Sequence, residues 1–240
     1  MTITQTLATA LISAHQTGTR AEASTLPQPD FATALAVHEI VQAALGPVCG
    51  FKVAARPDGP PVIAPIPASR SFVSGGAVAV NDTLGIEMEI GFELIAPPAD
   101  DMMSRPQDFF RPLLVLELVD TRVTGDGANA PLMKLADMQI NAGLVTGPAL
   151  DGWDGTDFGT VRGALRCGGT QVVEGALTVP GGSAVSNLAL FCDNIGDHCG
   201  GLQKGQIVIT GSLSGLAYFP SGTDVHGEVE GFGSIDFQLS

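Results

Sequence analysis

Residues 113–119 read Leu-Leu-Val-Leu-Glu-Leu-Val, so that six aliphatic residues enclose one glutamate, Glu117. A continuous apolar run of this length predicts a β-strand that is buried on both faces. A carboxylate inside such a strand loses its hydration and has to be paired, protonated or bound to a cation. The fold therefore has to bury both faces of this strand and also supply a partner for Glu117.

Two further carboxylates, Glu87 and Glu89, lie in a second strand-like segment, Ile-Glu-Met-Glu-Ile. Side chains two positions apart on a strand point to the same face, so these two can converge. Three carboxylates on rigid strands suit a hard divalent cation, and we predict that Glu87, Glu89 and Glu117 bind Mg²⁺ or Mn²⁺. Two alternatives stay open. Glu87, Glu89 and also Glu93 could lie on an exposed strand face, and Glu117 could form a purely structural ion pair with an arginine such as Arg122.

The composition indicates short strands joined by many turns, because the chain has 31 glycines and 16 prolines but only 15% charged residues. Its 240 residues suffice for one large domain, or for one domain with a small helical appendage. The formal net charge of -14 argues against nucleic acid as a partner. The N-terminus lacks a basic segment and no apolar stretch reaches membrane-spanning length, so we expect a cytoplasmic protein without a membrane partner.

The periodicity of apolar residues predicts helices at residues 4–15 and 31–45, the second capped by Asp30. The apolar stripe of the second helix would include Ile40, with His38 on the surface. We therefore expect an N-terminal helical segment, residues 1–48, followed by a β-rich domain, residues 49–240. Within that domain we predict strands at 49–53, 77–80, 87–95, 113–119 and 206–210, hairpins at 159–177 and 224–239, and helices at 131–140 and 183–196.

Lys52 lies in an apolar strand directly before a proline-rich loop. It is either a surface residue whose stem lies along apolar neighbours or a polar group that faces a pocket. Near a metal its pKa would fall, which suits a role in proton transfer. Arg56, on the same loop, could close over a substrate carboxylate through a bidentate contact, although an arginine there is more often solvated.

Asp120 and Asp137 are candidates for orienting the lysine, a metal-bound water or a ligand. The four cysteines contain no CxxC pair. Cys192, His198 and Cys199 could bind zinc, but no second ligand pair follows them, so we prefer free, reduced thiols.

Several short stretches follow one another in a recognisable order. They are residues 50–53 (Gly-Phe-Lys-Val), 86–92 (Ile-Glu-Met-Glu-Ile-Gly-Phe), 116–122 (Leu-Glu-Leu-Val-Asp-Thr-Arg), 136–137 and 141–147, 204–212 and 231–235. Together they resemble the fumarylacetoacetate hydrolase superfamily, and within it the 2-hydroxypenta-2,4-dienoate hydratases and 4-oxalocrotonate decarboxylases. The likeness covers nearly the whole chain.

The resemblance implies an α+β fold, a mixed β-sandwich roll preceded by two N-terminal helices. It also implies a metal that chelates a 2-oxo acid and stabilises the enolate. We therefore expect a lyase that adds water to 2-hydroxypenta-2,4-dienoate or a close analogue. The alternatives are a 4-oxalocrotonate-type decarboxylase or an acylpyruvate C–C hydrolase, and more remotely a non-catalytic assembly partner.

For the site we assign catalysis to Lys52 and Asp137, and substrate binding to Arg56 and Ser212. Self-association into a homo-oligomer is expected from the same resemblance. The loop after Lys52 and the stretch at residues 181–185 depart from the superfamily's pattern. We therefore expect the residues that surround the substrate to differ from those of the superfamily.

Overall fold

The computed structural model describes residues 1–240, and its chain begins with the two expected helices. Helix α1 (Ile3–Thr17) ends at Gly18 in the left-handed conformation, which a glycine adopts without steric strain. Helix α2 (Phe31–Leu45) begins where the Asp30 side chain accepts a hydrogen bond from the first turn. Both N-terminal helices are therefore present, with the predicted cap on the second.

The remaining helical elements are short, and none of the helices is long and apolar enough to cross a membrane. They are α3 (Pro106–Phe109), α4 (Pro131–Ala136), α5 (Ala184–Asn194) and the 3₁₀ segments η1 (Ala23–Thr25), η2 (Ala68–Arg70), η3 (Met102–Ser104), η4 (Met138–Ile140), η5 (Pro180–Gly182) and η6 (His198–Gly200).

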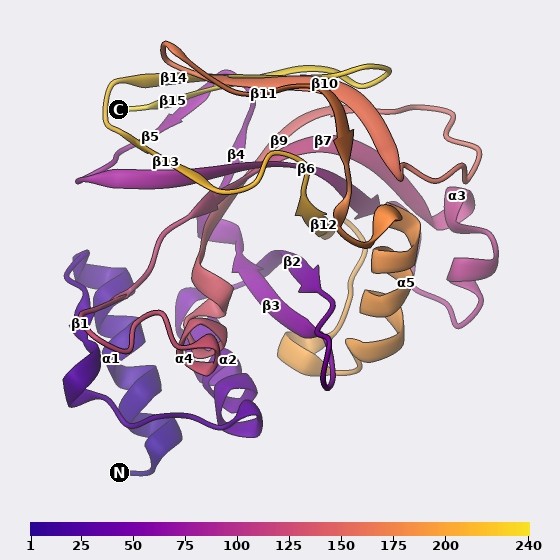
Figure 1. Cartoon of the computed structure of the whole chain (residues 1–240). Helices are drawn as coiled ribbons and strands as arrows, with labels where there is room; N and C mark the ends of the chain where they lie inside the picture. The colour runs from indigo at the N-terminus through magenta and orange to yellow at the C-terminus, as the bar shows by residue number, and fades with distance from the viewer.

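Nearly all of the strands belong to two mixed sheets (Figure 1). The strands of the eight-stranded sheet, in spatial order, are β3 (Val62–Pro67), β2 (Val48–Ala54), β12 (Ile207–Ser212), β6 (Thr83–Leu94), β7 (Phe110–Val119), β9 (Asn141–Ala149) and β4 (Ser71–Val73), with β13 (Ala217–Pro220) also paired to β6. Those of the five-stranded sheet are β11 (Thr170–Thr178), β10 (Thr160–Cys167), β14 (Thr223–Val229), β15 (Gly233–Leu239) and β5 (Gly76–Val78). A two-stranded parallel pair joins β1 (Ala21–Glu22) to β8 (Val123–Thr124).

Strand β7 lies inside the larger sheet and is covered on both faces. Leu114, Leu116 and Leu118 belong to the main hydrophobic core, which also contains residues of the five-stranded sheet and of α5. Leu113 and Val115 point to the other face and pack in a smaller cluster with residues of β3, β9 and β12. The prediction of a strand buried on both faces is confirmed, and Glu117 lies on the face of the smaller cluster.

A separate hydrophobic cluster joins the N-terminal helices to α4, as Figure 1 shows at the lower left. It contains Leu7 and Leu11 of α1, Val37 and Val41 of α2, and Leu135 of α4. A segment from the middle of the chain thus completes the core of the first 45 residues.

Two expectations for the helices are wrong. In α2, Ile40 is 40% exposed while His38 is fully buried, because α4 and η6 pack on the side of the helix that carries His38. The helix predicted at residues 131–140 ends at Ala136, and Gln139 has a left-handed backbone. The chain turns there to enter β9, a strand that the periodicity did not indicate.

Candidate metal centre

The pairing of β6 with β7 brings the three predicted carboxylates together. Glu87 lies directly opposite Glu117, and Glu89 lies opposite Val115, so all three side chains share one face of the sheet. Carboxylate oxygens of Glu87, Glu89 and Glu117 lie within 4.8 Å of one another. Glu117 is completely buried and Glu89 almost so. These residues therefore do not form an exposed acidic strand face. Glu93, the third glutamate of that alternative, pairs with Arg111 at 2.7 Å and is not part of the cluster.

Glu117 has two partners on one of its oxygens and none on the other. Its Oε1 accepts hydrogen bonds from Lys52 Nζ at 2.6 Å and from Asn141 Nδ2 at 2.8 Å. Its Oε2 is buried without any hydrogen-bond partner. A buried anionic oxygen without a donor is costly, and a cation at this position would remove that cost. The suggested ion pair of Glu117 with Arg122 is not formed.

Lys52 reaches the carboxylates from β2, which runs parallel to β12. The close approach of these strands requires Gly50, because a Cβ atom there would lie 2.2 Å from the carbonyl oxygen of Ile207. Only 13% of the Lys52 side chain is exposed. Burial acts to lower the pKa of Lys52, but the charges of Glu117, Glu89 and Glu87 outweigh it, so the pKa lies above its ordinary value. Without a metal the side chain is therefore an ammonium.

Glu89 is held by the turn at the end of β12. Its Oε2 accepts a hydrogen bond from the backbone of Gly211 at 2.7 Å, and Gly211 has a φ of 113°, which favours glycine. Burial raises the pKa of both Glu89 and Glu87, and the negative charge of Glu117 raises it further. The cluster thus holds more negative charge than its single lysine balances, which suits a divalent cation.

The three carboxylates and Lys52 line a cavity of about 420 Å³ together with Ser212. The other lining residues, from β2, η4, η5, α5 and β12, are uncharged. Lys52 is therefore the only positively charged side chain in this cavity. Arg56, expected to bind substrate, does not line it, because its guanidinium lies over the ring of Phe31, 5.1 Å from the centroid.

Asp137, expected to be catalytic, also lies outside this cavity. Its carboxylate accepts a hydrogen bond from Arg122 Nε at 2.6 Å and another from the backbone of Arg122 at 2.8 Å. Both side chains are buried, and the same guanidinium donates to the carbonyl of Asn141. This ion pair fixes the turn between α4 and β9, which is a structural role. Asp120, the other candidate, pairs with Arg20 at 2.7 Å.

Three polar residues of the site were not assigned a role from the sequence. Asn141, at the start of β9, bonds Glu117. Gln139 lines the cavity from the left-handed turn before β9, and its Oε1 is buried without a partner. Asn187 of α5 lines the opposite side and donates to the carbonyl of Thr210. The motif at residues 141–143 pointed to Asn141, but no local pattern indicated the other two.

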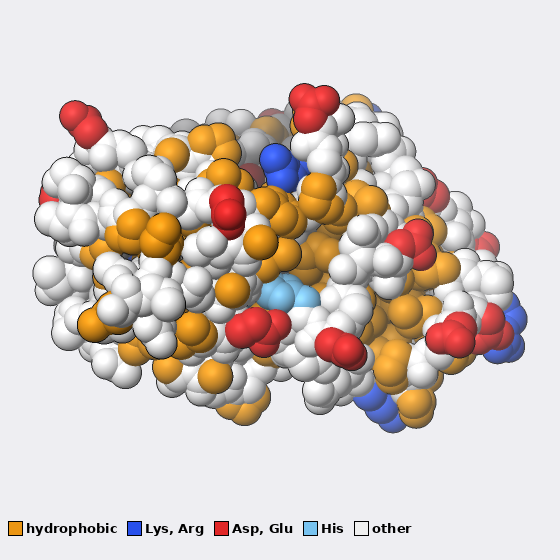
Figure 2. All heavy atoms as spheres, turned by 90° about the horizontal axis from the view of Figure 1, so that it is seen from below, with side chains coloured by type: hydrophobic (Ala, Val, Ile, Leu, Met, Phe, Trp, Pro, Cys, Tyr) orange, Lys and Arg blue, Asp and Glu red, His pale blue; other side chains and the backbone are white.

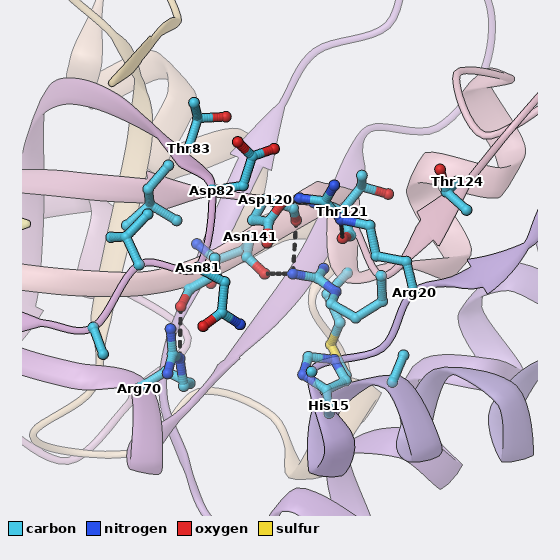
Figure 3. A pocket seen from close by; sticks show the side chains of 18 of the residues that line it. His15, Arg20, Arg70, Asn81, Asp82, Thr83, Asp120, Thr121, Thr124 and Asn141 are labelled. Carbon is cyan, nitrogen blue, oxygen red and sulfur yellow. Dashed lines mark hydrogen bonds and ion pairs between the residues drawn. The ribbon is translucent and has the colours of Figure 1, made fainter. Parts of the chain in front are cut away.

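A second, larger cavity of about 550 Å³ lies between α1 and the ends of β6 and β7. Figure 3 shows Arg20, Arg70 and His15 around it, contributed by different parts of the chain. Two of its arginines are already paired, Arg20 with Asp120 and Arg122 with Asp137, and Arg70 donates a hydrogen bond to the carbonyl of Ala142. We therefore place the candidate site at Glu87, Glu89 and Glu117, where three carboxylates face a single lysine and Glu117 Oε2 has no partner.

The folded chain has the architecture of a defined structural class, the fumarylacetoacetate hydrolase-like fold. Among solved structures, the chain is similar to 4-oxalocrotonate decarboxylase from Pseudomonas putida G7, complexed with magnesium and adipate. The TM-score is 0.77 at 19% identity, and the match covers 100% of this chain and 99% of that chain.

More distant similarity extends to other enzymes of this fold. The 5-carboxymethyl-2-hydroxymuconate delta-isomerase from Mycobacterium smegmatis matches with a TM-score of 0.58 at 15% identity, over 80% of each chain. The fumarylpyruvate hydrolase from Pseudomonas aeruginosa, in complex with Mn²⁺ and pyruvate, matches with a TM-score of 0.53 at 16% identity, over 75% of this chain and 79% of that one. No protein-family model and no curated protein matches the sequence. The comparisons confirm the resemblance drawn from the motifs, as a likeness of fold.

Proposed function

We propose that this protein is a divalent-metal-dependent enzyme that acts on a small 2-oxo or 2-hydroxydienoic acid by way of an enolate. The observation that carries the proposal is the buried group of Glu87, Glu89 and Glu117, in which Glu117 Oε2 lacks a partner. Three carboxylate oxygens suit Mg²⁺ or Mn²⁺. The similar solved structures that contain magnesium or Mn²⁺ support this choice.

Glu87, Glu89 and Glu117 would hold the ion, which when bound supplies positive charge to stabilise the charge that develops on the substrate's 2-oxygen. The residues around the ion are already held in place. Lys52 and Asn141 orient Glu117, while the Gly211 backbone orients Glu89. Such preorganisation avoids the cost of ordering the ligands when the ion binds.

Lys52 is the group of this chain that can move a proton. Its raised pKa makes it an ammonium before the metal binds, so Nζ is a proton donor and a positive charge in that state. A bound cation opposes that charge and lowers the pKa of Lys52, which allows the amine to accept a proton as well. Asp137 and Arg56 have no part in this proposal, because neither lines the cavity.

The lining of the cavity favours a substrate with one carboxylate. Beyond the carboxylates and Lys52, every side chain that lines it is uncharged. A dicarboxylate would place its second negative charge there without a cationic partner. Hydration of 2-hydroxypenta-2,4-dienoate is therefore our leading reaction.

Decarboxylation of a 4-oxalocrotonate-type acid is the second candidate. It is favoured by the similarity to the decarboxylase from Pseudomonas putida G7 over the whole of both chains. An acylpyruvate hydrolase is less favoured, because none of the four histidines lines the cavity to activate water.

An ultraviolet assay of 2-hydroxypenta-2,4-dienoate decides between these reactions. We expect the dienoate to be lost in the presence of Mg²⁺ or Mn²⁺, with 4-hydroxy-2-oxopentanoate as the product, and the loss to stop when a chelator is added. Turnover of 4-oxalocrotonate with release of carbon dioxide, and none of the dienoate, would establish the decarboxylase instead. Failure of both substrates, with metal bound, would contradict both candidates.

A further inference from the structure

A second group of metal-binding side chains lies where α2 meets η6, and it shares no residue with the carboxylate cluster. His38 and Glu39 are neighbours on α2, while His198 and Cys199 belong to η6, 160 residues further along the chain. His38 Nδ1 lies 3.2 Å from His198 Nε2, and Cys199 Sγ lies 3.7 Å from the same nitrogen. Glu39 Oε1 lies 3.1 Å from His198 Nδ1.

The hydrogen bonds around His38 determine which of its nitrogens carries the proton. His38 is completely buried, and its Nε2 lies 2.5 Å from the carbonyl oxygen of Leu135, which can only accept. Nε2 therefore carries the proton. With the proton on Nε2, the neutral ring presents the lone pair of Nδ1 toward His198.

His198 cannot satisfy both of its neighbours as a neutral ring. In one tautomer Nδ1–H donates a hydrogen bond to the Glu39 carboxylate, which leaves a lone pair on Nε2, directly facing the lone pair of His38 Nδ1. The opposite tautomer places the Nδ1 lone pair against the carboxylate. One positive charge is therefore missing between the two rings, and either a proton or a metal ion has to supply it.

The two separations measured from His198 Nε2, to His38 Nδ1 and to Cys199 Sγ, match those between neighbouring ligands of a metal ion. Zinc in tetrahedral coordination lies about 2.0–2.1 Å from nitrogen and about 2.3 Å from sulfur, which separates two nitrogens by about 3.3 Å and a nitrogen from a sulfur by about 3.6 Å. The two distances found here are 3.2 Å and 3.7 Å. The geometry points to a binding site for a zinc-like divalent cation, formed by His38 Nδ1, His198 Nε2 and Cys199 Sγ.

Glu39 then has the place of an outer carboxylate that orients His198 through its distal nitrogen, an arrangement common at zinc sites. It also accepts a hydrogen bond from the backbone of Cys199 at 2.7 Å, which holds η6 against α2. The set differs from the one that the spacing of residues suggested, because His38 replaces Cys192. Imidazole and thiolate ligands select zinc-like ions, whereas the carboxylate cluster selects Mg²⁺ or Mn²⁺.

The site can be reached from solvent. Glu39 and Cys199 line a surface hollow of about 380 Å³, and His198 lines a smaller one beside it. Figure 2 views this face, which is the lower one of Figure 1, and shows a histidine side chain next to acidic side chains. A bound ion would connect α2 to the segment between α5 and β12, and thus join the helical core to the strand that carries Gly211 and Ser212.

The test is a titration of the full-length, reduced protein with Co²⁺ in the presence of excess Mg²⁺, which occupies the carboxylate cluster. We expect one cobalt ion per chain, with a near-ultraviolet thiolate-to-cobalt absorption and visible bands typical of a tetrahedral site. Added Zn²⁺ should displace the cobalt and abolish both signals. Oxygen ligands alone produce no thiolate absorption, so this signal is independent of the carboxylate cluster and of catalysis.

Cys199→Ser should abolish the thiolate absorption, while the matched control Cys192→Ser should retain it. Zn²⁺ should raise the unfolding temperature of the parent and of Cys192→Ser, but not that of Cys199→Ser. Circular dichroism verifies that each variant is folded. Absence of the thiolate absorption in the parent would overturn the inference, because a proton alone would then satisfy His38 and His198. Persistence of the absorption in Cys199→Ser would overturn it as well.

Discussion

Lys52 Nζ and Glu117 Oε1 lie 2.6 Å apart, although their strands, β2 and β7, are separated in the sheet by β12 and β6. The contact is possible because both side chains leave the same face of a curved sheet. It gives the buried carboxylate a cation, but only on one of its two oxygens. The free oxygen, Glu117 Oε2, is the observation that supports the metal site we propose.

Glu117→Gln should abolish Mg²⁺ binding, because the substitution removes the charge at the centre of the cluster while retaining its size. We expect a loss of affinity greater than the roughly 10–100-fold loss caused by removing an outer-shell partner. Isothermal titration calorimetry with Mg²⁺ and Mn²⁺ measures this. Glu93→Gln, which affects a carboxylate paired with Arg111, is the matched control and should bind normally. Equal affinities in the two variants would refute the ligand assignment.

Lys52→Met should reduce turnover by about 100- to 10,000-fold, the range typical of a lost proton-transfer group. Its metal affinity should be unchanged or higher, since the variant removes a positive charge beside the binding carboxylates. Steady-state kinetics and metal titration separate these two effects. Lys204→Met, at an exposed lysine, controls for the loss of a lysine elsewhere. Normal turnover in Lys52→Met would remove this residue from the mechanism.

Arg122→Met should destabilise the protein by about 3–5 kcal/mol, because it leaves the buried carboxylate of Asp137 without its partner. Urea unfolding at neutral pH measures the difference. Arg20→Met breaks the exposed pair with Asp120 and should change the free energy of unfolding by only about 0–1 kcal/mol. A small effect of Arg122→Met would contradict the structural role that we give to Asp137.

Stability should fall as the pH is lowered from 6.5 toward 3, because His15 stays neutral in the folded chain. Its burial, with the nearby charges of Arg122 and Arg70, lowers its pKa to about 3. Between pH 6.5 and about 3, the unfolded chain binds a proton at His15 that the folded chain does not. The free energy of unfolding therefore falls by up to about 1.4 kcal/mol for each pH unit in this range. Urea unfolding at several pH values should show a shallower slope for His15→Asn, and an unchanged slope would contradict this explanation.

Mg²⁺ should raise the unfolding temperature and a chelator should reverse the change, since the folded carboxylate cluster binds the ion and the unfolded chain does not. At a concentration of 100 times Kd, the gain in stability is about 2.7 kcal/mol. Differential scanning calorimetry at increasing Mg²⁺ concentrations measures the shift. Glu117→Gln should show no shift, and an equal shift in that variant would place the ion elsewhere.

Local patterns predicted strands β2, β6, β7 and β12 of the site, but not β9. Glu87 and Glu89 are two apart on a strand, so their shared face follows from strand geometry, and Glu117 interrupts an apolar run, which predicts its burial. The cap of α2 and the hairpin of β10 and β11 were predicted in the same way, from residues adjacent in the chain.

Contacts between distant segments were not predictable from local patterns. Nothing near Asp137 indicates that Arg122 will pair with it rather than with Glu117, since both choices satisfy a buried carboxylate. Arg56 was assigned to the substrate because it follows Lys52, yet its guanidinium stacks on Phe31 of α2. His38 was placed on the surface because the elements that cover its side of α2 come from much later in the chain.

The amino-acid sequence by itself determined a sheet-rich fold and three carboxylates on strands, because side-chain alternation and capping depend only on neighbouring residues. The tertiary structure alone decided that Lys52 and Asn141 hold one oxygen of Glu117 and leave the other free. It also decided that His38 faces His198 across two distant segments. The physical reason is that burial and the pairing of charges depend on which segments pack together, and packing is a property of the whole chain.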